Sequence, residues 1–285
     1  MKKWSLVLFT TFSQMAVGAF WVLMALRHYL ALQSDLAHAN ALILTPLMIT
    51  VAIMIFSLSI SLAHLGSPFI AYRAISNFRA SWLSREIAFA LFFTLSSLAV
   101  AFFLWAQIDS VKMQAALIWL AIFFGYMLVF SMSRVYMLRT VPIWNAFFTP
   151  TSFFLTALIL GSVVAGTIFA FRGFSLSASI HNDILTILTK WTLLFLGIES
   201  ILIIGRTINY ASASHKDTIQ KLWEGYKNIF YLRIFLNIAG IVCLSTTLSQ
   251  AKTHPVFYAL CFVLILSAEL ADRFLFYTAR EFSGI

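Results

Sequence analysis

A succession of long apolar runs restricts this chain of 285 residues more than any other feature. Each run is close to the ~20 residues that a helix needs to cross a bilayer. Inside a bilayer the backbone must satisfy its own hydrogen bonds, so such runs form helices unless they close a barrel, whose strands would alternate apolar and polar residues. These runs do not alternate. There are eight of them, at about residues 5–26, 42–63, 87–105, 113–132, 153–171, 191–210, 228–248 and 256–277.

The sequence therefore predicts an all-α integral membrane bundle of eight transmembrane helices, occupying residues 1–285 as a single membrane domain. The composition, 61% hydrophobic and 10% charged, excludes a soluble globular enzyme, because too little polar surface is left to cover the core. The first run follows Lys2 and Lys3, but it is far longer than the core of a signal peptide, so we expect a retained first helix. The lipid bilayer is the first partner that the sequence predicts.

Several other partners and cofactors are not expected. Cys243 and Cys261 lie in separate runs without the spacing of an iron–sulfur or other metal site. A b-type haem needs paired histidines at membrane depth, whereas the six histidines all lie at predicted helix ends or in loops. The net charge of +9 comes from short loops rather than basic runs, so nucleic acid is not an expected partner.

The distribution of cations predicts an orientation. With eight spans both termini share one face, and 13 of the 19 Lys and Arg residues fall on it. The positive-inside rule places this face in the cytoplasm. Arginines that bind a partner or a ligand do not indicate the orientation of the chain in the membrane.

Charged residues inside the predicted helices need a partner, because each costs about 2.5–3.5 kcal/mol at a helix centre. Glu269 and Arg273 are four residues apart, which predicts a direct structural ion pair on one helical face. Glu199 with Arg206, and Arg233 with Asn237, are further candidates. All of these residues are expected to hold the bundle together.

The segment from His64 to Glu86 is open to two interpretations. Helix capping explains His64 at the end of one helix, Gly66 as a stop, Ser84 as the N-cap of the next helix and Glu86 in its first turn. The second interpretation is a hydroquinone site. Oxidation of a hydroquinone releases two electrons and two protons, and an imidazole and a partly desolvated carboxylate at one interface are suitable acceptors for the protons.

Six stretches of the sequence resemble the membrane anchor subunit of bacterial anaerobic dimethyl sulfoxide reductase, the DmsC family. They run from the first predicted helix to the last: LFTTFSQMAVGAFWVL (8–23), HLGSP (64–68), LSREIA (83–88), SRVYMLRTVPIW (133–144), TPTSFFLTALILG (149–161) and AELADRFLFY (268–277). The resemblance implies a multi-pass subunit of the bacterial cytoplasmic (inner) membrane. It would bind menaquinol as its substrate and pass electrons to a ferredoxin-like subunit with four iron–sulfur clusters, while a molybdopterin catalytic subunit holds the molybdenum.

His64 and Glu86 stand at the positions of the family's histidine and glutamate associated with quinol binding, so the resemblance favours a catalytic role for both. The expected quinol-binding set also includes Gly66, Ser67, Arg73, Arg134 and Tyr136. No metal ligand is expected in this chain. The sequence departs from the family in two respects: the family pattern places the N-terminus outside, opposite to the orientation from the cations, and the span with Glu199 and Arg206 matches only loosely.

Two other functions are compatible with the sequence. A secondary transporter is compatible with four plus four helices that carry charged residues inside the bundle. The helices of such a transporter, however, would carry paired breaks at mid-span. A purely structural anchor would use His64 and Glu86 as caps only. The aromatic segment 139–150, with Trp144 and two prolines, is expected to lie along the interface, either as part of the surface on which the iron–sulfur subunit docks or as an ordinary aromatic belt.

Overall fold

The computed structural model describes residues 2–33, 35–62, 77–108, 110–138, 141, 144–172, 178–211, 216–249 and 254–279. All the regular structure of these residues is helical, which confirms the predicted all-α fold. The helices are α1 (Lys2–Gln33), α2 (Leu36–Leu62), α4 (Trp82–Trp105), α5 (Val111–Tyr136), α6 (Phe148–Phe171), α7 (Ala178–Ala211), α8 (Lys216–Ser249) and α9 (Pro255–Thr278).

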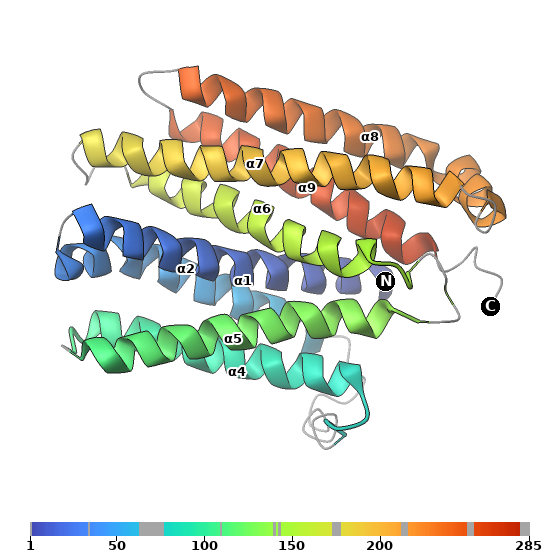
Figure 1. Ribbon diagram of the computed structural model, residues 1–285. Coiled ribbons are helices and arrows are strands. Elements are labelled where there is room, and N and C mark those ends of the chain that lie inside the picture. The colour runs from blue at the N-terminus through green and yellow to red at the C-terminus, as the bar shows by residue number, and fades with distance from the viewer. Residues whose placement is uncertain are drawn as a thin grey trace.

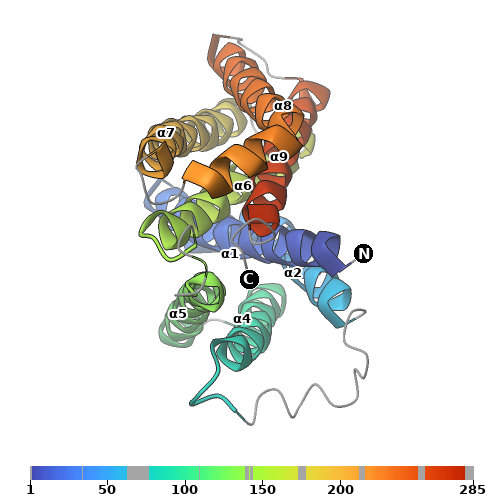
Figure 2. The same ribbon diagram turned by 90° about the vertical axis from the view of Figure 1, so that its right-hand side faces the viewer.

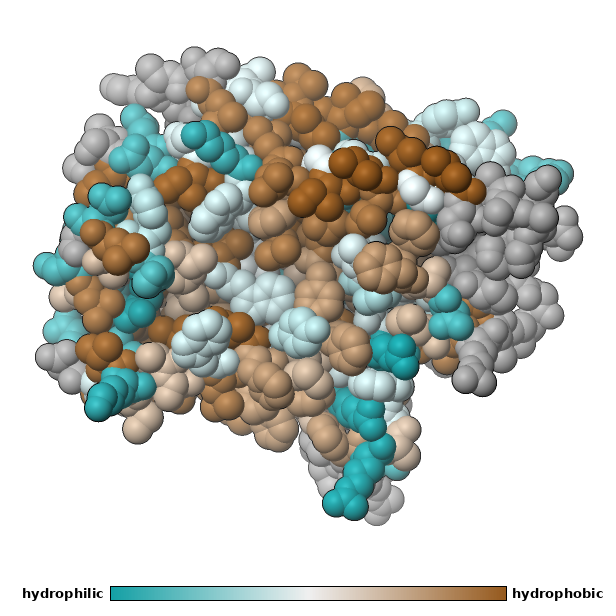
Figure 3. All heavy atoms as spheres, viewed as in Figure 1, coloured by the Kyte–Doolittle hydropathy of each residue, from teal (hydrophilic) through white to brown (hydrophobic). Residues whose placement is uncertain are grey.

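Seven helices, α1 to α8, are long and apolar enough to cross a membrane, as judged over the described residues. The eighth, α9, carries Glu269, Asp272 and Arg273, and all three side chains are buried against neighbouring helices. Figure 3 shows apolar side chains across the middle of the bundle and hydrophilic ones gathered toward the helix ends. This distribution matches a multi-pass membrane protein.

The helices run alternately back and forth, and α1 begins at the end of the bundle where α9 ends (Figure 1). We call this the terminal end. It also carries the beginning of α4, α6 and α8. Seen along the helices, α4 and α5 lie on one side of α1 and α6, whereas α7 and α8 lie on the other (Figure 2).

Two halves of four helices share one pattern of contacts. In the first half α1 packs on α2, α2 on α4 and α4 on α5; in the second half α6 packs on α7, α7 on α8 and α8 on α9. The two halves meet where α1 packs on α6. Because α1 and α6 both start at the terminal end, the two halves point the same way along the membrane normal.

Several helices extend beyond the predicted spans. The apolar run of α7 begins at 191, but the helix begins at Ala178, because Ile184, Leu185 and Leu188 form a buried stripe among polar residues. Such a stripe has helical periodicity without high mean hydropathy. Hydropathy therefore marks the part of a helix that crosses the hydrocarbon and misses its extension.

Candidate functional site

The predicted quinol-binding residues are divided between described and undescribed segments. His64, Gly66, Ser67 and Arg73 lie in the segment 63–76, outside the described residues. Glu86, Arg134 and Tyr136 are described, as are Glu269 and Arg273. The expected proximity of His64 and Glu86 therefore remains a prediction.

Glu86 is buried near the terminal end of α4, with 3% of its surface exposed. The sequence interpretation as a first-turn capping residue is wrong, because α4 begins at Trp82 and its first turn contains no acidic residue. The N-cap is Ser81 instead of Ser84, and the Ser81 hydroxyl accepts a hydrogen bond from the Ser84 amide. Glu86 thus lies one turn further in, where capping no longer explains a buried carboxyl group.

The carboxyl group of Glu86 is incompletely satisfied. Its Oε2 atom is buried and has no hydrogen-bond partner among the described residues. A buried polar atom without a partner costs about 1–3 kcal/mol, and more when it is charged. Such an atom in a native structure is expected to meet a water molecule, a ligand or another part of the chain.

Two tyrosines lie at the same end of the bundle as Glu86. Tyr136 is the last residue of α5 and Tyr277 lies near the end of α9. Their rings are 5.0 Å apart, and the Tyr277 hydroxyl lies 3.1 Å from the Thr10 hydroxyl of α1. The site residues thus come from α4, α5, α9 and α1, all at the terminal end.

Arg134 makes different contacts. Its guanidinium group lies 5.4 Å from the Trp82 ring centre and donates a hydrogen bond to the Met137 sulfur. Arg85 lies over the same ring at 4.1 Å. Trp82 therefore holds two cations at the terminal ends of α4 and α5.

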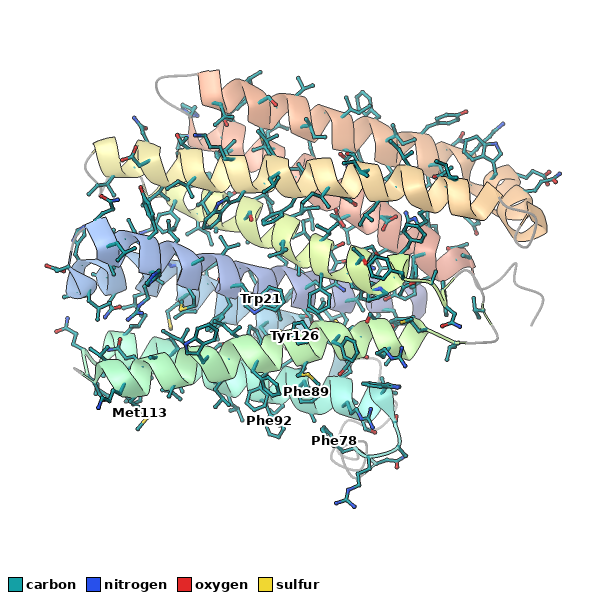
Figure 4. The ribbon with its side chains drawn as sticks, in the orientation of Figure 1. Trp21, Phe78, Phe89, Phe92, Met113 and Tyr126 are labelled. Atoms are coloured by element: carbon teal, nitrogen blue, oxygen red, sulfur yellow. The ribbon has the colours of Figure 1, made fainter. Side chains whose placement is uncertain are left out.

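An aromatic row leads along α4 from the terminal end. The Phe78 ring is 5.6 Å from Phe89, and the Phe92 ring is 5.1 Å from Phe124 of α5. Figure 4 shows Phe78, Phe89 and Phe92 following one another along this part of the bundle. Phe78 and Phe92 are exposed, so the row presents aromatic side chains to the lipid along α4, the helix that carries Glu86.

Glu269 and Arg273 are joined by a third residue rather than by the direct ion pair that the sequence predicts. The Thr156 hydroxyl of α6 donates to Glu269 Oε2 over 2.7 Å and accepts from Arg273 Nη2 over 2.8 Å. Arg273 is completely buried, and its guanidinium group lies 3.8 Å from the Phe153 ring centre. The four-residue spacing correctly predicts that the two side chains lie on one face of α9. The Thr156 side chain of α6 lies between their charged groups.

Asp272 of α9 is a buried charged residue that sequence reasoning missed. Its carboxylate is 2.7 Å from Arg206 of α7 and 2.8 Å from Arg233 of α8. Arg233 also lies 3.5 Å from Glu199. The signal available in the sequence is a third charged residue in a span that already contains Glu269 and Arg273. A buried carboxylate of this kind needs cations, and here they come from two other helices.

A small pocket opens beside these charges. Its lining comes from α6, α7, α8 and α9, and includes Glu199, Arg206, Arg233 and Asp272 together with the apolar Leu202 and Ile203. It has room for about one water molecule. Among the described residues no group of three His, Cys, Asp or Glu is placed to hold a metal ion.

The predicted interfacial segment is partly built into the bundle. Trp144 is buried, and its indole nitrogen donates a hydrogen bond of 2.8 Å to the Phe276 carbonyl oxygen of α9. Phe147 is 75% exposed. Residues 139, 140, 142 and 143 of the segment are not among the described residues. Trp144 therefore holds the segment onto α9 and is not available to a partner.

The sequence has recognisable relatives. Residues 1–279 match the family model described as the DMSO reductase anchor subunit (DmsC). Two anaerobic dimethyl sulfoxide reductase chains of Escherichia coli (strain K12), one of them YnfH, are each 28% identical to this protein, over 281 and 284 residues, covering 96% of it and 94% of each relative. An anaerobic dimethyl sulfoxide reductase chain of Haemophilus influenzae is 30% identical over 161 residues, or 55% of this protein and 54% of the relative. No solved structure matches.

Proposed function

The chain belongs to the DMSO reductase anchor subunit (DmsC) family, and from this premise we propose that it binds menaquinol and oxidises it. An anchor of this reductase works with a catalytic and an iron–sulfur subunit in a membrane. In the proposed reaction, the iron–sulfur subunit is ferredoxin-like with four clusters and receives the electrons. A molybdopterin subunit carries out the terminal reduction, and the complex lies in the bacterial inner membrane.

The observation that carries the proposal is the buried Glu86 carboxyl group with an unpartnered oxygen atom. A quinol hydroxyl would donate a hydrogen bond to this oxygen and remove the cost of leaving it unsatisfied. The carboxylate would then accept the proton as the quinol is oxidised. A capping role does not account for Glu86, because the first turn of α4 ends before it.

The surroundings of Glu86 suit an amphipathic ligand. The hydroxyl groups of Tyr136 and Tyr277 would provide polar contacts at the terminal end, and the exposed rings of Phe78 and Phe92 would border the lipid. A naphthoquinol has an aromatic head with two hydroxyl groups and an isoprenoid tail. The head would meet the polar groups while the tail stays among apolar side chains.

The reaction balances with two proton acceptors. Menaquinol loses two electrons and the protons of its two hydroxyl groups, and becomes menaquinone. Glu86 accepts one proton, and His64 is proposed as the acceptor on the opposite hydroxyl, with Gly66, Ser67 and Arg73 shaping that side. The electrons pass directly to the iron–sulfur subunit, since the sequence predicts no haem or cluster in this chain.

The test compares two electron donors in the purified three-subunit complex. Glu86→Gln and His64→Ala are each expected to lower kcat/KM with a soluble naphthoquinol by about 100-fold, the scale of general acid–base catalysis. Activity with a reduced viologen, which donates electrons without quinol chemistry, should stay unchanged. Glu224→Gln on the exposed part of α8 is the control and should change neither activity.

Unchanged naphthoquinol turnover in the assembled Glu86→Gln complex would contradict the proposal and leave the purely structural anchor. The secondary-transporter interpretation is not retained. The repeat of two four-helix halves is compatible with a transporter, but the family consists of reductase anchors.

A further inference from the structure

Two arginines share one tryptophan ring at the terminal end of the bundle. The guanidinium carbon of Arg85 lies 4.1 Å from the centre of the Trp82 ring, and that of Arg134 lies 5.4 Å from the same ring. The two arginines belong to α4 and α5, which pack on one another. The two cations thus lie within about 10 Å, the Debye length at 0.1 M salt, so they repel one another.

No carboxylate in the described part of the chain balances these two charges. Arg85 donates to the carbonyl oxygens of Phe78 and Arg79, over 2.9 Å and 2.7 Å. Arg134 donates to the Met137 sulfur over 3.7 Å, and a thioether is a weak acceptor. Both arginines are half-buried, so each can still be reached by a ligand from outside. The pair therefore needs an anion that the described residues do not supply.

The beginning of α4 adds to the positive potential. The N-terminus of a helix carries roughly half an elementary positive charge, and the first turn of α4 contains no acidic residue to offset it. The two carbonyl bonds hold the Arg85 side chain in place, so little conformational entropy is lost when its remaining N–H groups bind an anion. Phosphate oxygens accept the parallel N–H groups of a guanidinium fork.

The side chains next to the arginine pair are apolar and exposed. Leu83 directly follows Trp82, Leu138 lies four residues after Arg134, and the two leucines are 55% and 41% exposed. Tryptophan rings are enriched at the membrane–water interface, at the level of the lipid headgroups. A soluble acidic protein would bring polar side chains against these leucines, whereas a lipid brings acyl chains. The surroundings therefore favour a lipid headgroup over a protein partner.

An aromatic stripe of α5 leads from the pair toward the middle of the bundle. The Phe130 ring lies 5.8 Å from the Trp82 ring and stacks on the Tyr126 ring at 6.3 Å. At steps of three and four residues, one face of α5 carries Phe123, Tyr126, Phe130 and Arg134. Figure 4 shows Tyr126 on α5, and both Tyr126 and Phe123 are exposed. The stripe can support an acyl chain, and it does not include the phenylalanine row along α4.

We propose that Arg85, Arg134 and Trp82 form a binding site for the phosphate group of one anionic phospholipid. The two guanidinium groups donate to the phosphate oxygens, and the negative charge offsets their mutual repulsion. One acyl chain of the lipid lies along the aromatic stripe of α5. A zwitterionic lipid binds less tightly, because the choline cation next to its phosphate meets the same two arginines. The site does not depend on the proposed quinol oxidation.

The test titrates the purified three-subunit complex with dioleoyl phosphatidylglycerol and follows binding by native mass spectrometry. The complex should bind one molecule about tenfold more tightly than it binds dioleoyl phosphatidylcholine. Arg85→Gln and Arg134→Gln should each weaken the binding of phosphatidylglycerol by about tenfold, the effect of losing a charge-assisted hydrogen bond. Arg85→Lys should fall between, because it keeps the charge and loses the fork. Viologen activity of the Arg85→Gln complex should remain, which shows that the complex assembles.

The matched control is Lys227→Gln. It removes one exposed cation from the third of α8 that lies nearest the terminal end, so the change in net charge is the same. Phosphatidylglycerol should bind this variant as tightly as it binds the unsubstituted complex. A loss equal to that of the arginine variants would show that only the net charge matters, and the specific site would be disproved.

Three further outcomes would overturn the proposal. Equal affinity for the two lipids would leave an ordinary aromatic belt with interfacial arginines. Inorganic phosphate that binds as tightly as phosphatidylglycerol, and depends equally on the arginines, would show a site for a free anion to which acyl chains contribute nothing. If the unsubstituted complex binds no phosphatidylglycerol and Arg85→Gln releases the iron–sulfur subunit, the pair docks that protein instead of a lipid.

Discussion

Gly18 of α1 and Gly161 of α6 meet backbone to backbone, so that a Cβ atom added to Gly161 would stand 2.2 Å from the Gly18 carbonyl carbon. A Cβ on Gly18 would lie 1.7 Å from the Ala157 carbonyl oxygen. Small residues allow membrane helices to approach this closely and to gain dispersion contacts along their length. The crossing joins the two four-helix halves of the bundle through the first helix of each half.

Gly161→Ala should destabilise the protein by about 3 kcal/mol, because the added methyl group meets backbone atoms that cannot rotate away. Thermal unfolding of the purified protein in detergent measures the effect. Gly197→Ala is the control, since nothing lies within 4 Å of a Cβ at that position. Equal unfolding temperatures of the two variants would contradict the close crossing.

Asp272→Asn should be among the polar substitutions that destabilise the second four-helix half of the bundle most strongly. It removes the carboxylate that neutralises Arg206 and Arg233, and leaving such charges buried costs about 3–5 kcal/mol. The change is read from the unfolding temperature of the protein. Asp183→Asn at an exposed position of α7 should have little effect, and an equally large loss there would argue against a specific role for the buried pairs.

Arg27→Met should lower stability without changing the apparent KM for a naphthoquinol. Arg27 donates to Asn40 over 2.7 Å and to Gln114 over 2.8 Å, which joins α1, α2 and α5. Its loss leaves these groups unsatisfied and costs about 1–3 kcal/mol. The residue lies toward the end of α1 away from Glu86, so a raised KM would be unexpected. Lys112→Met on the exposed start of α5 is the control.

Trp144→Phe should cost about 1 kcal/mol, because it removes one hydrogen bond to the Phe276 carbonyl oxygen and retains an aromatic ring. The rings of Trp144 and Phe276 are stacked, 5.1 Å apart, so most of the packing remains. Urea unfolding of the purified protein quantifies the loss. Trp105→Phe at a position with 68% exposure should leave stability unchanged, and a larger effect there than at Trp144 would contradict the docked indole.

Much of the fold follows from the sequence, because the bilayer imposes a local rule. A run of about 20 apolar residues must satisfy its backbone within itself, so the class and the approximate position of the spans need no knowledge of neighbouring helices. The helix extension at Ile184, Leu185 and Leu188 was missed for the converse reason. Those residues are buried by packing, which hydropathy along the sequence does not report.

The candidate site was only partly predictable. Glu86 stood out as an acid beside a predicted span, but whether it capped the helix depended on where α4 begins. Glu269 and Arg273 were correctly placed on one face of a helix, but the side chain between them comes from Thr156, which is more than a hundred residues away in the sequence. Helical spacing predicts which residues lie on one face of the same helix. It does not predict which other helix places a side chain between them.

The sequence by itself determined that this protein is a membrane bundle of helices, that it resembles the reductase anchors and that its intramembrane charges need partners. These properties follow from the cost of burying polar groups in hydrocarbon and from local patterns of residues. The tertiary structure alone decided the partners: Asp272 for Arg206 and Arg233, Thr156 between Glu269 and Arg273, and a Glu86 oxygen left open among the described residues. Those choices depend on the order and rotation of packed helices, which bring together residues that are far apart in the sequence.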